Sequence, residues 1–216
     1  MKVVIYGGGK LGLYMLSLLS GEHFSHLKVL GFVDDQLPKS NNHCSSGLNL
    51  FGTLKQYKNN PEPTSDDIFC VLAIGYNDLK ARIGAFTDAK KMGIQFVTIV
   101  HPSAILLPGS DVAEGSYIGP GAILDVNTKI GAANFIDAGC ILSEEVIMGV
   151  GNYLSPKVVI CGHTRIGMAN FFGAASCVRN GLSIGDCNFL NMQTLLIRNL
   201  ENGVMVSEAR KITYLE

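Results

Sequence analysis

Between positions 129 and 154 the sequence reads KIGAANFIDAGCILSEEVIMGVGNYL, and large apolar residues recur in it at every sixth place. These residues are Ile130, Ile136, Leu142, Met148 and Leu154. Followed in both directions, the series runs from Leu106 to Leu196 and contains only aliphatic residues, Met or Phe. A period of six fits neither the 3.6-residue period of an α-helix nor the two-residue alternation of an ordinary strand.

This period is typical of hexapeptide repeats, in which each repeat supplies one short strand and one turn of a parallel β-helix. Three repeats close one coil of a triangular prism, the sixth-position residue points into the prism, and residues 106–196 have room for about five coils. Glycine follows the sixth-position residue at positions 119, 131, 149, 167, 173 and 185. We expect these glycines to serve turns that need a permissive backbone.

Residues 1–103 follow a different rule, because short apolar runs alternate there with helical periodicity. Strands are expected at 3–6, 29–33, 68–74 and 94–100, and helices at 11–19 and 79–92. Strands that alternate with helices predict a parallel sheet built from βαβ units. The fold class is therefore an α/β domain at 1–103 followed by an all-β domain, a β-helix, at 104–216.

Composition narrows the function classes. The chain has 17 Lys and Arg against 18 Asp and Glu and shows no basic stripe, so nucleic acid is not an expected partner. The N-terminus does not read as a signal peptide and no apolar run is long enough to span a membrane, so we expect a soluble, cytoplasmic protein. The six cysteines form no C-x-x-C pair, and we expect reduced, buried thiols rather than disulfides or a metal site.

The two halves together resemble a known family, the sugar O- and N-acyltransferases of the sialic acid O-acetyltransferase and bacillosamine N-acetyltransferase type. The similarity covers nearly the whole chain. The matching stretches are YGGGKLG at 6–12, GFVDD at 31–35, AIGYN at 73–77, HPSA at 101–104 and FGAA at 172–175. The resemblance implies a Rossmann-like domain, a left-handed β-helix, a homotrimer, and active sites between neighbouring β-helices.

The glycine-rich motif Gly7-x-Gly9-x-x-Gly12 stands between an expected strand and an expected helix, where backbone N–H groups can meet a phosphate. Asp34 lies 22 residues beyond Gly12, so NAD binding is one alternative, although a β-helix follows instead of a dehydrogenase domain. Another alternative is that the glycines only make a tight turn. The resemblance instead assigns contacts with a nucleotide-linked sugar to Gly8, Gly9, Asp34, Asp35, Gly75 and Asn77.

Acyl transfer from a thioester to an amine needs a neutral amine and an N–H donor for the oxyanion. The resemblance places a histidine followed by an acid at the positions of Glu144 and Glu145, so the histidine is absent, and it places a thioester-binding N–H at Gly162. Three alternatives follow. Glu144 could act as the base, with its pKa raised by desolvation and by Glu145. His163 lies one coil of eighteen residues beyond Glu145, so it could stack on Glu145 at about 5 Å and act as the base in place of Glu144. In the third alternative no side chain is needed as a base. Adjacent glutamates at a turn can also be simply a solvated edge.

The resemblance places coenzyme A against Gly173, Ala174 and Ala175. The usual C-terminal Gly-x-Pro-Ala loop is absent, and Arg210 or Lys211 could meet the phosphates of the coenzyme instead. A hydroxyl depends on a well-placed base more than an amine does, so the missing histidine favours N-acylation by acetyl-CoA of an amino sugar on a nucleotide. The alternatives are a sialic-acid-type O-acetyltransferase with His163 as base, and an inactive relative that binds nucleotide sugar.

Overall fold

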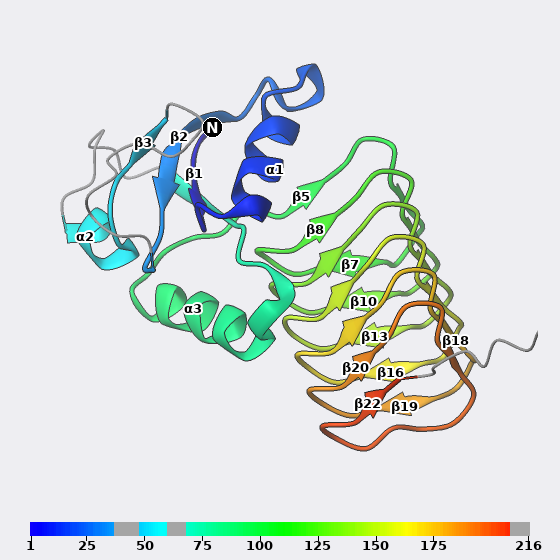
Figure 1. Ribbon diagram of the computed structural model, residues 1–216. Helices are drawn as coiled ribbons and strands as arrows, with labels where there is room; N and C mark the ends of the chain where they lie inside the picture. The colour runs from blue at the N-terminus through cyan, green and yellow to red at the C-terminus, as the bar shows by residue number, and fades with distance from the viewer. Residues whose placement is uncertain (37–47, 60–67, 208–216) are drawn as a thin grey trace, which may run out of the picture.

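The computed structural model describes residues 1–36, 48–59 and 68–207. Its N-terminal part contains one parallel sheet with the strand order β3-β2-β1-β4 (Figure 1). The elements are β1 (Lys2–Tyr6), α1 (Lys10–Leu19), the 3-10 helix η1 (Glu22–Phe24), β2 (Lys28–Val33), β3 (Asn49–Leu50), α2 (Leu54–Asn59), β4 (Ile68–Leu72), the 3-10 helix η2 (Tyr76–Asp78) and α3 (Leu79–Lys91). The expected parallel α/β arrangement is confirmed, with β3 and α2 as additional elements. The strand expected at 94–100 is wrong for this sheet, because only Ile99–Val100 forms a strand there and it pairs with Tyr117–Ile118 of the second half.

Helices cover both faces of this sheet, because successive strand residues point to opposite sides. Val3 and Ile5 of β1 pack in one apolar cluster with Met15 of α1. Val4 and Tyr6 pack in another cluster, which also holds apolar residues of α2 and α3. The carboxyl ends of β1, β2 and β4 therefore open between α1 and α3.

From Ile99 onward the chain forms a parallel β-helix of two-residue strands (Figure 1). The strands are β5 (Ile99–Val100), β6 (Ile105–Leu106), β7 (Asp111–Val112), β8 (Tyr117–Ile118), β9 (Ile123–Leu124), β10 (Lys129–Ile130), β11 (Phe135–Ile136), β12 (Ile141–Leu142), β13 (Ile147–Met148), β14 (Tyr153–Leu154), β15 (Val159–Ile160), β16 (Arg165–Ile166), β17 (Phe171–Phe172), β18 (Cys177–Val178), β19 (Ser183–Ile184), β20 (Phe189–Leu190), β21 (Leu195–Leu196) and β22 (Met205–Val206). All-parallel sheets with repeated strands fit the expected left-handed β-helix. The β-helix takes in β5, which lies before the expected start at residue 104.

The strands belong to three sheets. Sheet I runs β22-β20-β17-β14-β11-β8-β5, sheet II runs β21-β18-β15-β12-β9-β6, and sheet III runs β19-β16-β13-β10-β7. The turns between sheets form three edges of a prism, each opposite the remaining sheet. The I–II edge includes residues 137–140 and 173–176, the II–III edge includes 143–146 and 161–164, and the III–I edge includes 131–134 and 149–152.

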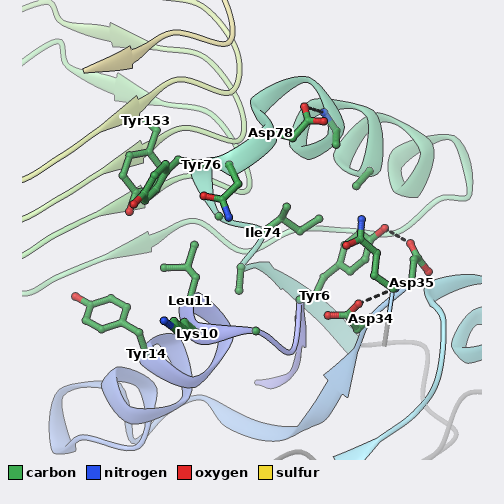
Figure 2. A pocket seen from close by; sticks show the side chains of 18 residues that line it. Tyr6, Lys10, Leu11, Tyr14, Asp34, Asp35, Ile74, Tyr76, Asp78 and Tyr153 are labelled. Carbon is green, nitrogen blue, oxygen red and sulfur yellow. Dashed lines mark hydrogen bonds between the residues drawn. The ribbon is translucent and has the colours of Figure 1, made fainter. Parts of the chain in front are cut away.

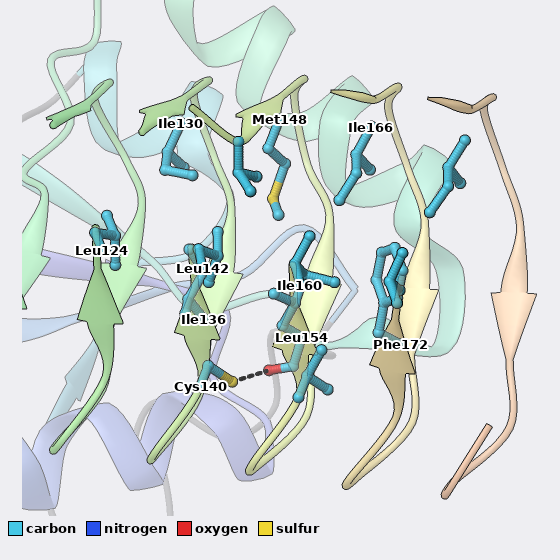
Figure 3. Packing of buried hydrophobic residues seen from close by; sticks show 14 of the residues in the cluster. Leu124, Ile130, Ile136, Cys140, Leu142, Met148, Leu154, Ile160, Ile166 and Phe172 are labelled. Atoms are coloured by element: carbon cyan, nitrogen blue, oxygen red, sulfur yellow. Dashed lines mark hydrogen bonds between the residues drawn. The ribbon is translucent and has the colours of Figure 1, made fainter. Parts of the chain in front are cut away.

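The inward positions of the prism are those of the six-residue series (Figure 3). From Ile118 to Leu196 every member of the series is at most 4% exposed, which confirms the expected core. Leu106 is 41% exposed and Val112 is only partly buried, because they lie in the first coil and have a neighbouring coil on one side only. A repeated apolar column is thus the main source of stability in this half.

The expectation that the glycines after the inward residues supply a permissive backbone for the turns is wrong. Neither Gly131 nor Gly149 has a positive φ; the left-handed residue stands two places later, as at Ala133 (φ 57°) and Gly151 (φ 70°). A Cβ on Gly131 would lie 2.7 Å from the carbonyl oxygen of Gly149, and a Cβ on Gly149 would lie 2.7 Å from that of Gly167. These glycines are needed because stacked coils approach one another closely, not because the turn needs their φ.

A ladder of aromatic side chains runs along the outer face of sheet I. Its members stack at centroid distances of 4.5 to 5.8 Å. They are Tyr117, Phe135, Tyr153, Phe171 and Phe189. The N-terminal domain docks on this ladder, because the Tyr14 hydroxyl of α1 lies 2.8 Å from the Tyr117 hydroxyl and the Tyr76 ring lies 5.0 Å from the Tyr153 ring.

Helix α3 fixes the second contact between the two domains, at the III–I edge. Arg82 is fully buried, and its Nε donates a hydrogen bond to the carbonyl oxygen of Ala133 at 3.1 Å. A second guanidinium nitrogen donates to the carbonyl oxygen of Ile74, and burial lowers the Arg82 pKa to about 10. Lys90 and Glu114 add an ion pair at 2.8 Å. These contacts hold α3 and the chain segment before it against the β-helix.

The cysteines in the described ranges carry free thiols. Cys70 and Cys140 are buried, whereas Cys161, Cys177 and Cys187 are partly exposed. Cys44 lies outside the described residues. No helix within the described ranges combines the length and the apolar character that crossing a membrane requires.

Candidate active site

A pocket of about 780 Å³ lies where the carboxyl ends of the N-terminal strands face sheet I (Figure 2). It brings together five of the six residues expected to contact a nucleotide sugar. These are Gly9, Asp34, Asp35, Gly75 and Asn77. The β-helix contributes Tyr153 to the same pocket, and α1 contributes Lys10, Leu11 and Tyr14. The pocket is therefore built by both domains.

The glycine-rich loop between β1 and α1 forms one wall of this pocket. Gly7 has a φ of +115°, and a Cβ there would lie 2.6 Å from the carbonyl oxygen of Ala73. A Cβ on Gly12 would overlap the carbonyl oxygen of Gly7. Both glycines are thus required by the loop itself, while Gly9, the N-cap of α1, has open space around it and faces the pocket.

The carboxylate of Asp34 accepts the hydrogen bond of the backbone N–H that a dinucleotide phosphate would use. Its Oδ2 accepts a hydrogen bond from the N–H of Gly8 at 2.7 Å, and its Oδ1 accepts one from the N–H of Gln36 at 2.8 Å. A carboxylate at this amide repels a phosphate by like charge. The geometry thus disfavours the NAD alternative.

Asp35 is tied into the fold as well as the pocket. Its Oδ1 accepts a hydrogen bond from the N–H of Leu54 at the start of α2, at 2.9 Å, and its Oδ2 accepts one from the hydroxyl of Tyr6. Burial, followed by this hydrogen bond and the charge of Asp35, raises the pKa of Tyr6 well above its usual value. Tyr6 was not expected from sequence, because a strand residue in an apolar run gives no signal of a polar contact.

The segment from Gly75 to Asp78 closes the pocket on the side of α3. Asp78 is the N-cap of α3 and accepts a hydrogen bond from the N–H of Ala81 at 2.8 Å. The ring of Tyr76 packs on Tyr153 and Phe171 at centroid distances of 5.0 and 4.9 Å, which holds the segment against sheet I. The aromatic residue at every eighteenth position was the sequence signal that could have identified Tyr153.

The II–III edge brings together the residues expected to take part in acyl transfer. His163 Nδ1 lies 3.3 Å from Glu145 Oε2, and His163 Nε2 lies 3.8 Å from Glu144 Oε1. The stacking of His163 on Glu145 follows the eighteen-residue register expected from the repeat. The three side chains are 52 to 59% exposed, so the pair is open to solvent in a single chain.

Gly162 lies directly against the Glu144 carboxylate, since a Cβ there would overlap it. Gly162 is buried, and among the residues that the structure describes none accepts a hydrogen bond from its N–H. Glu145 and His163 have φ values of 56° and 57°, but the same turn position elsewhere is also left-handed, so this conformation does not mark a functional residue.

The expected coenzyme A stretch lies on a different edge. Gly173, Ala174 and Ala175 belong to the I–II edge, whereas Glu144, Glu145 and His163 belong to the II–III edge, opposite sheet I and its pocket. A Cβ on Gly173 would overlap the backbone of Met192 in the next coil, so stacking alone already requires this glycine. Arg210 and Lys211 lie outside the described residues. One chain thus does not bring its expected catalytic and nucleotide-binding residues into one site.

Neither models of known protein families nor curated protein sequences match this chain. Solved structures do. The acetyltransferase domain of PglB from Neisseria gonorrhoeae FA1090 superposes with a TM-score of 0.81 at 18% identity, covering 97% of each chain. A histidine-to-asparagine variant of perosamine N-acetyltransferase from Caulobacter crescentus, in complex with CoA and GDP-perosamine, gives a TM-score of 0.82 at 23% identity over 95% of this chain and 92% of that one.

WeeI from Acinetobacter baumannii AYE gives a TM-score of 0.74 at 18% identity, over 97% of this chain and 98% of that one. In each case the likeness covers both the α/β part and the β-helix. This chain therefore has the complete two-part fold of these proteins.

Proposed function

We propose that this protein is an N-acyltransferase that moves an acetyl group from acetyl-CoA to the amino group of a nucleotide-linked sugar. The observation that carries the proposal is the pocket between the two domains, in which Asp34, Gly75 and Asn77 of the α/β part face Tyr153 of the β-helix. A protein of the same fold is solved with CoA and a nucleotide-linked sugar, GDP-perosamine. The substrates are those of cytoplasmic biosynthesis, and we infer a cytoplasmic location on that ground.

In this proposal the N-terminal part is a Rossmann-like domain that holds the nucleotide. Its strand order β3-β2-β1-β4 is that of one half of a doubly wound sheet, and its pocket lies at the carboxyl ends of the strands. Gly9 lines the loop wall, Gly8 holds Asp34 beside it through its N–H, and Asp34 and Asp35 present carboxylates there. The hydrogen-bond acceptors at this wall suit the donors of a nucleobase or ribose.

The acyl-transfer step needs few groups from the protein, since a thioester is already activated. The amine attacks the thioester carbonyl, and the N–H of Gly162 stabilises the oxyanion. Glu144, or His163 oriented by Glu145, takes the proton from the amine in this proposal. Coenzyme A runs along Gly173, Ala174 and Ala175 on the I–II edge, with Arg210 and Lys211 as candidate partners of its phosphates.

A homotrimer would unite these separated groups. The outward residues of sheet II form an apolar column that includes Ile105, Ile141 and Leu195, which are 50%, 37% and 61% exposed. An apolar face of this kind favours association. If three copies pack their sheets II around a three-fold axis, the I–II edge of one copy meets the II–III edge of the next.

The proposal is tested by offering acetyl-CoA with UDP-, dTDP- and GDP-linked 3-amino and 4-amino sugars and measuring free thiol. We expect thiol release with at least one amino sugar and none with the matching hydroxy sugar. Release that depends on a hydroxyl instead would favour the O-acetyltransferase. If folded, trimeric protein releases no thiol with any sugar of the panel, that result would contradict the proposed function and favour the alternative that the protein is an inactive relative that binds nucleotide sugar.

The contact between His163 and Glu145 at 3.3 Å is the observation that favours O-acylation as the second candidate. A hydroxyl needs a positioned base, so His163→Ala should abolish turnover in that case. With an amine acceptor and Glu144 or no side chain as base, His163→Ala lowers kcat far less. Glu145→Gln provides the matched control, because it keeps a hydrogen-bond partner for the imidazole without its negative charge.

A further inference from the structure

One carboxylate on the I–II edge has no part in the mechanism described so far. Asp137 directly follows β11 and is half-buried beside the aromatic ladder of sheet I. Tyr117 and Tyr153, the partners of Phe135 on the two neighbouring strands, are close enough that the Asp137 charge contributes to raising the pKa of each phenol. Tyr153 itself lines the pocket. Asp137 therefore lies on the turn after the strand that pairs with Tyr153, next to the pocket, although it does not line the pocket in a single chain.

The same residue stands in the column expected to carry coenzyme A. The N–H of Asp137 donates to the carbonyl oxygen of Leu154, and the N–H of Ser155 donates to that of Phe172, so the turns beginning at Asp137, Ser155 and Gly173 stack in successive coils. Two coils correspond to about 10 Å at the usual strand spacing. A thioester held along Gly173 to Ala175 could reach Asp137 without leaving this edge.

The carboxylate has free capacity to accept a proton. Its Oδ1 accepts a hydrogen bond from the N–H of Ala138 at 2.7 Å, and no other described residue donates a hydrogen bond to its Oδ2. The groups around it are the phenols of Tyr117 and Tyr153 and the thiol of Cys140, all neutral because burial raises their pKa values. Burial likewise raises the pKa of Asp137, which makes its carboxylate a stronger base.

The local structural role of Asp137 does not require a carboxylate. Asn191 stands at the same turn position on the same edge, and its Oδ1 accepts a hydrogen bond from the N–H of Met192 at 2.8 Å. Asp125 makes the same contact with the N–H of Val126 at 2.6 Å, but on the II–III edge. The turn is thus served by Asn as well as by Asp, which leaves the negative charge of Asp137 without a structural explanation.

We propose that Asp137 is a further catalytic residue, which takes the first proton from the sugar ammonium bound in the pocket of the same chain and so supplies the neutral amine, while Glu144 or His163 of a neighbouring copy takes the second proton. This role rests on the proposed function. The sugar ammonium loses one proton to Asp137, and the neutral amine nitrogen forms a C–N bond with the thioester carbonyl carbon. The nitrogen loses its second proton to Glu144 or His163, the C–S bond breaks, and that proton passes to the leaving thiolate. The products are the amide and free coenzyme A, and Asp137 returns its proton to solvent.

The test compares Asp137→Asn with Asp125→Asn, using the amino sugar and acetyl-CoA that give the highest thiol release with wild-type protein. We expect Asp137→Asn to lower kcat by about 100-fold or more, the range of general-base catalysis, with little change in KM for either substrate. Asp125→Asn should leave kcat unchanged. The acidic limb of the pH profile of kcat, present in wild type as Asp137 becomes protonated, should disappear in Asp137→Asn.

A kcat and a pH profile in Asp137→Asn equal to those of Asp125→Asn would overturn the role of Asp137 while leaving the proposed function standing. Absence of turnover by wild-type protein with every amino sugar would overturn both. Nucleotide-sugar affinity, measured by calorimetry, checks that both variants are folded, because an intact pocket should bind the nucleotide sugar equally well in both.

Discussion

Replacing Asn152 by Ala would remove the middle of a buried amide ladder on the III–I edge, beside the domain interface. Asn152 Oδ1 accepts hydrogen bonds from the backbone N–H of Asn170 at 2.9 Å and from its Nδ2 at 3.0 Å. Asn152 Nδ2 donates to the carbonyl oxygen of Gly167 at 3.0 Å. Within the described ranges these three groups have no other hydrogen-bond partner, so the substitution leaves the two buried groups of Asn170 and the partly buried carbonyl oxygen of Gly167 unpaired.

An unpaired buried polar group costs about 1–3 kcal/mol, so the two buried groups of Asn170 predict a loss of about 2 kcal/mol or more, to which the Gly167 carbonyl adds. The last rung of the ladder gives a matched comparison. Asn188 Oδ1 accepts one hydrogen bond, from the N–H of Val204 at 2.7 Å, and its Nδ2 is already buried without a partner. Asn188→Ala therefore leaves one group unpaired and should cost about 1–3 kcal/mol.

Urea unfolding followed by circular dichroism measures both free energies. We expect Asn152→Ala to be less stable than Asn188→Ala by about 2 kcal/mol, with an unchanged dependence on urea. Equal losses in the two variants would refute the reasoning, because they would show that the ladder's hydrogen bonds do not determine the cost.

Three shorter predictions concern stability. Because the pKa of Asp137 is raised in the folded state, Asp137→Asn should be more stable than wild type at pH 7. The difference in stability should shrink as the pH falls toward the unfolded-state pKa of about 3.9. Urea unfolding of both proteins at several pH values measures this difference. Gly149→Ala places a Cβ 2.7 Å from the carbonyl oxygen of Gly167 and should cost about 1–3 kcal/mol through overpacking. Gly181→Ala, with open space and a φ of 70°, should cost only about 1–2 kcal/mol, the cost of the left-handed conformation. Leu154→Ala empties a fully buried position of the inward column and should cost about 2–5 kcal/mol in the same assay.

The repeat made one half of the structure predictable. Once the period of six and the coil of eighteen residues are known, each position is inward, outward or in a turn, and the column of each residue follows. That is why the inward core and the contact between Glu145 and His163 could be stated in advance. The reason for the glycines at positions such as 149 failed, because the close approach of stacked coils is a property of two coils and cannot be read from one turn.

The rest depended on how the two halves dock, which the repeat does not encode. The sequence contains the aromatic column of sheet I, but nothing in it says that Tyr76 and Tyr14 pack there. Arg82 was missed because a buried cation whose partners are backbone carbonyls has no sequence signature. Asp137 was missed because only the docked domain places a pocket beside this turn, and the repeat does not encode the docking.

The separation of functional groups around the prism leads to one last prediction. Asp137 lies on the I–II edge and Glu144 on the II–III edge of the same chain, so a site that uses both needs two copies. Asp137→Asn and Glu144→Gln should each lose activity alone, yet trimers assembled from an equal mixture of the two should regain it. In a closed trimer with each site shared by two neighbours, about a quarter of the sites would combine an intact Asp137 with an intact Glu144. Thiol release near that fraction of wild type, appearing only after the variants are unfolded and reassembled together, would demonstrate the shared site. Activity that stays at the sum of the two separate variants would show that no site takes both carboxylates from neighbouring copies.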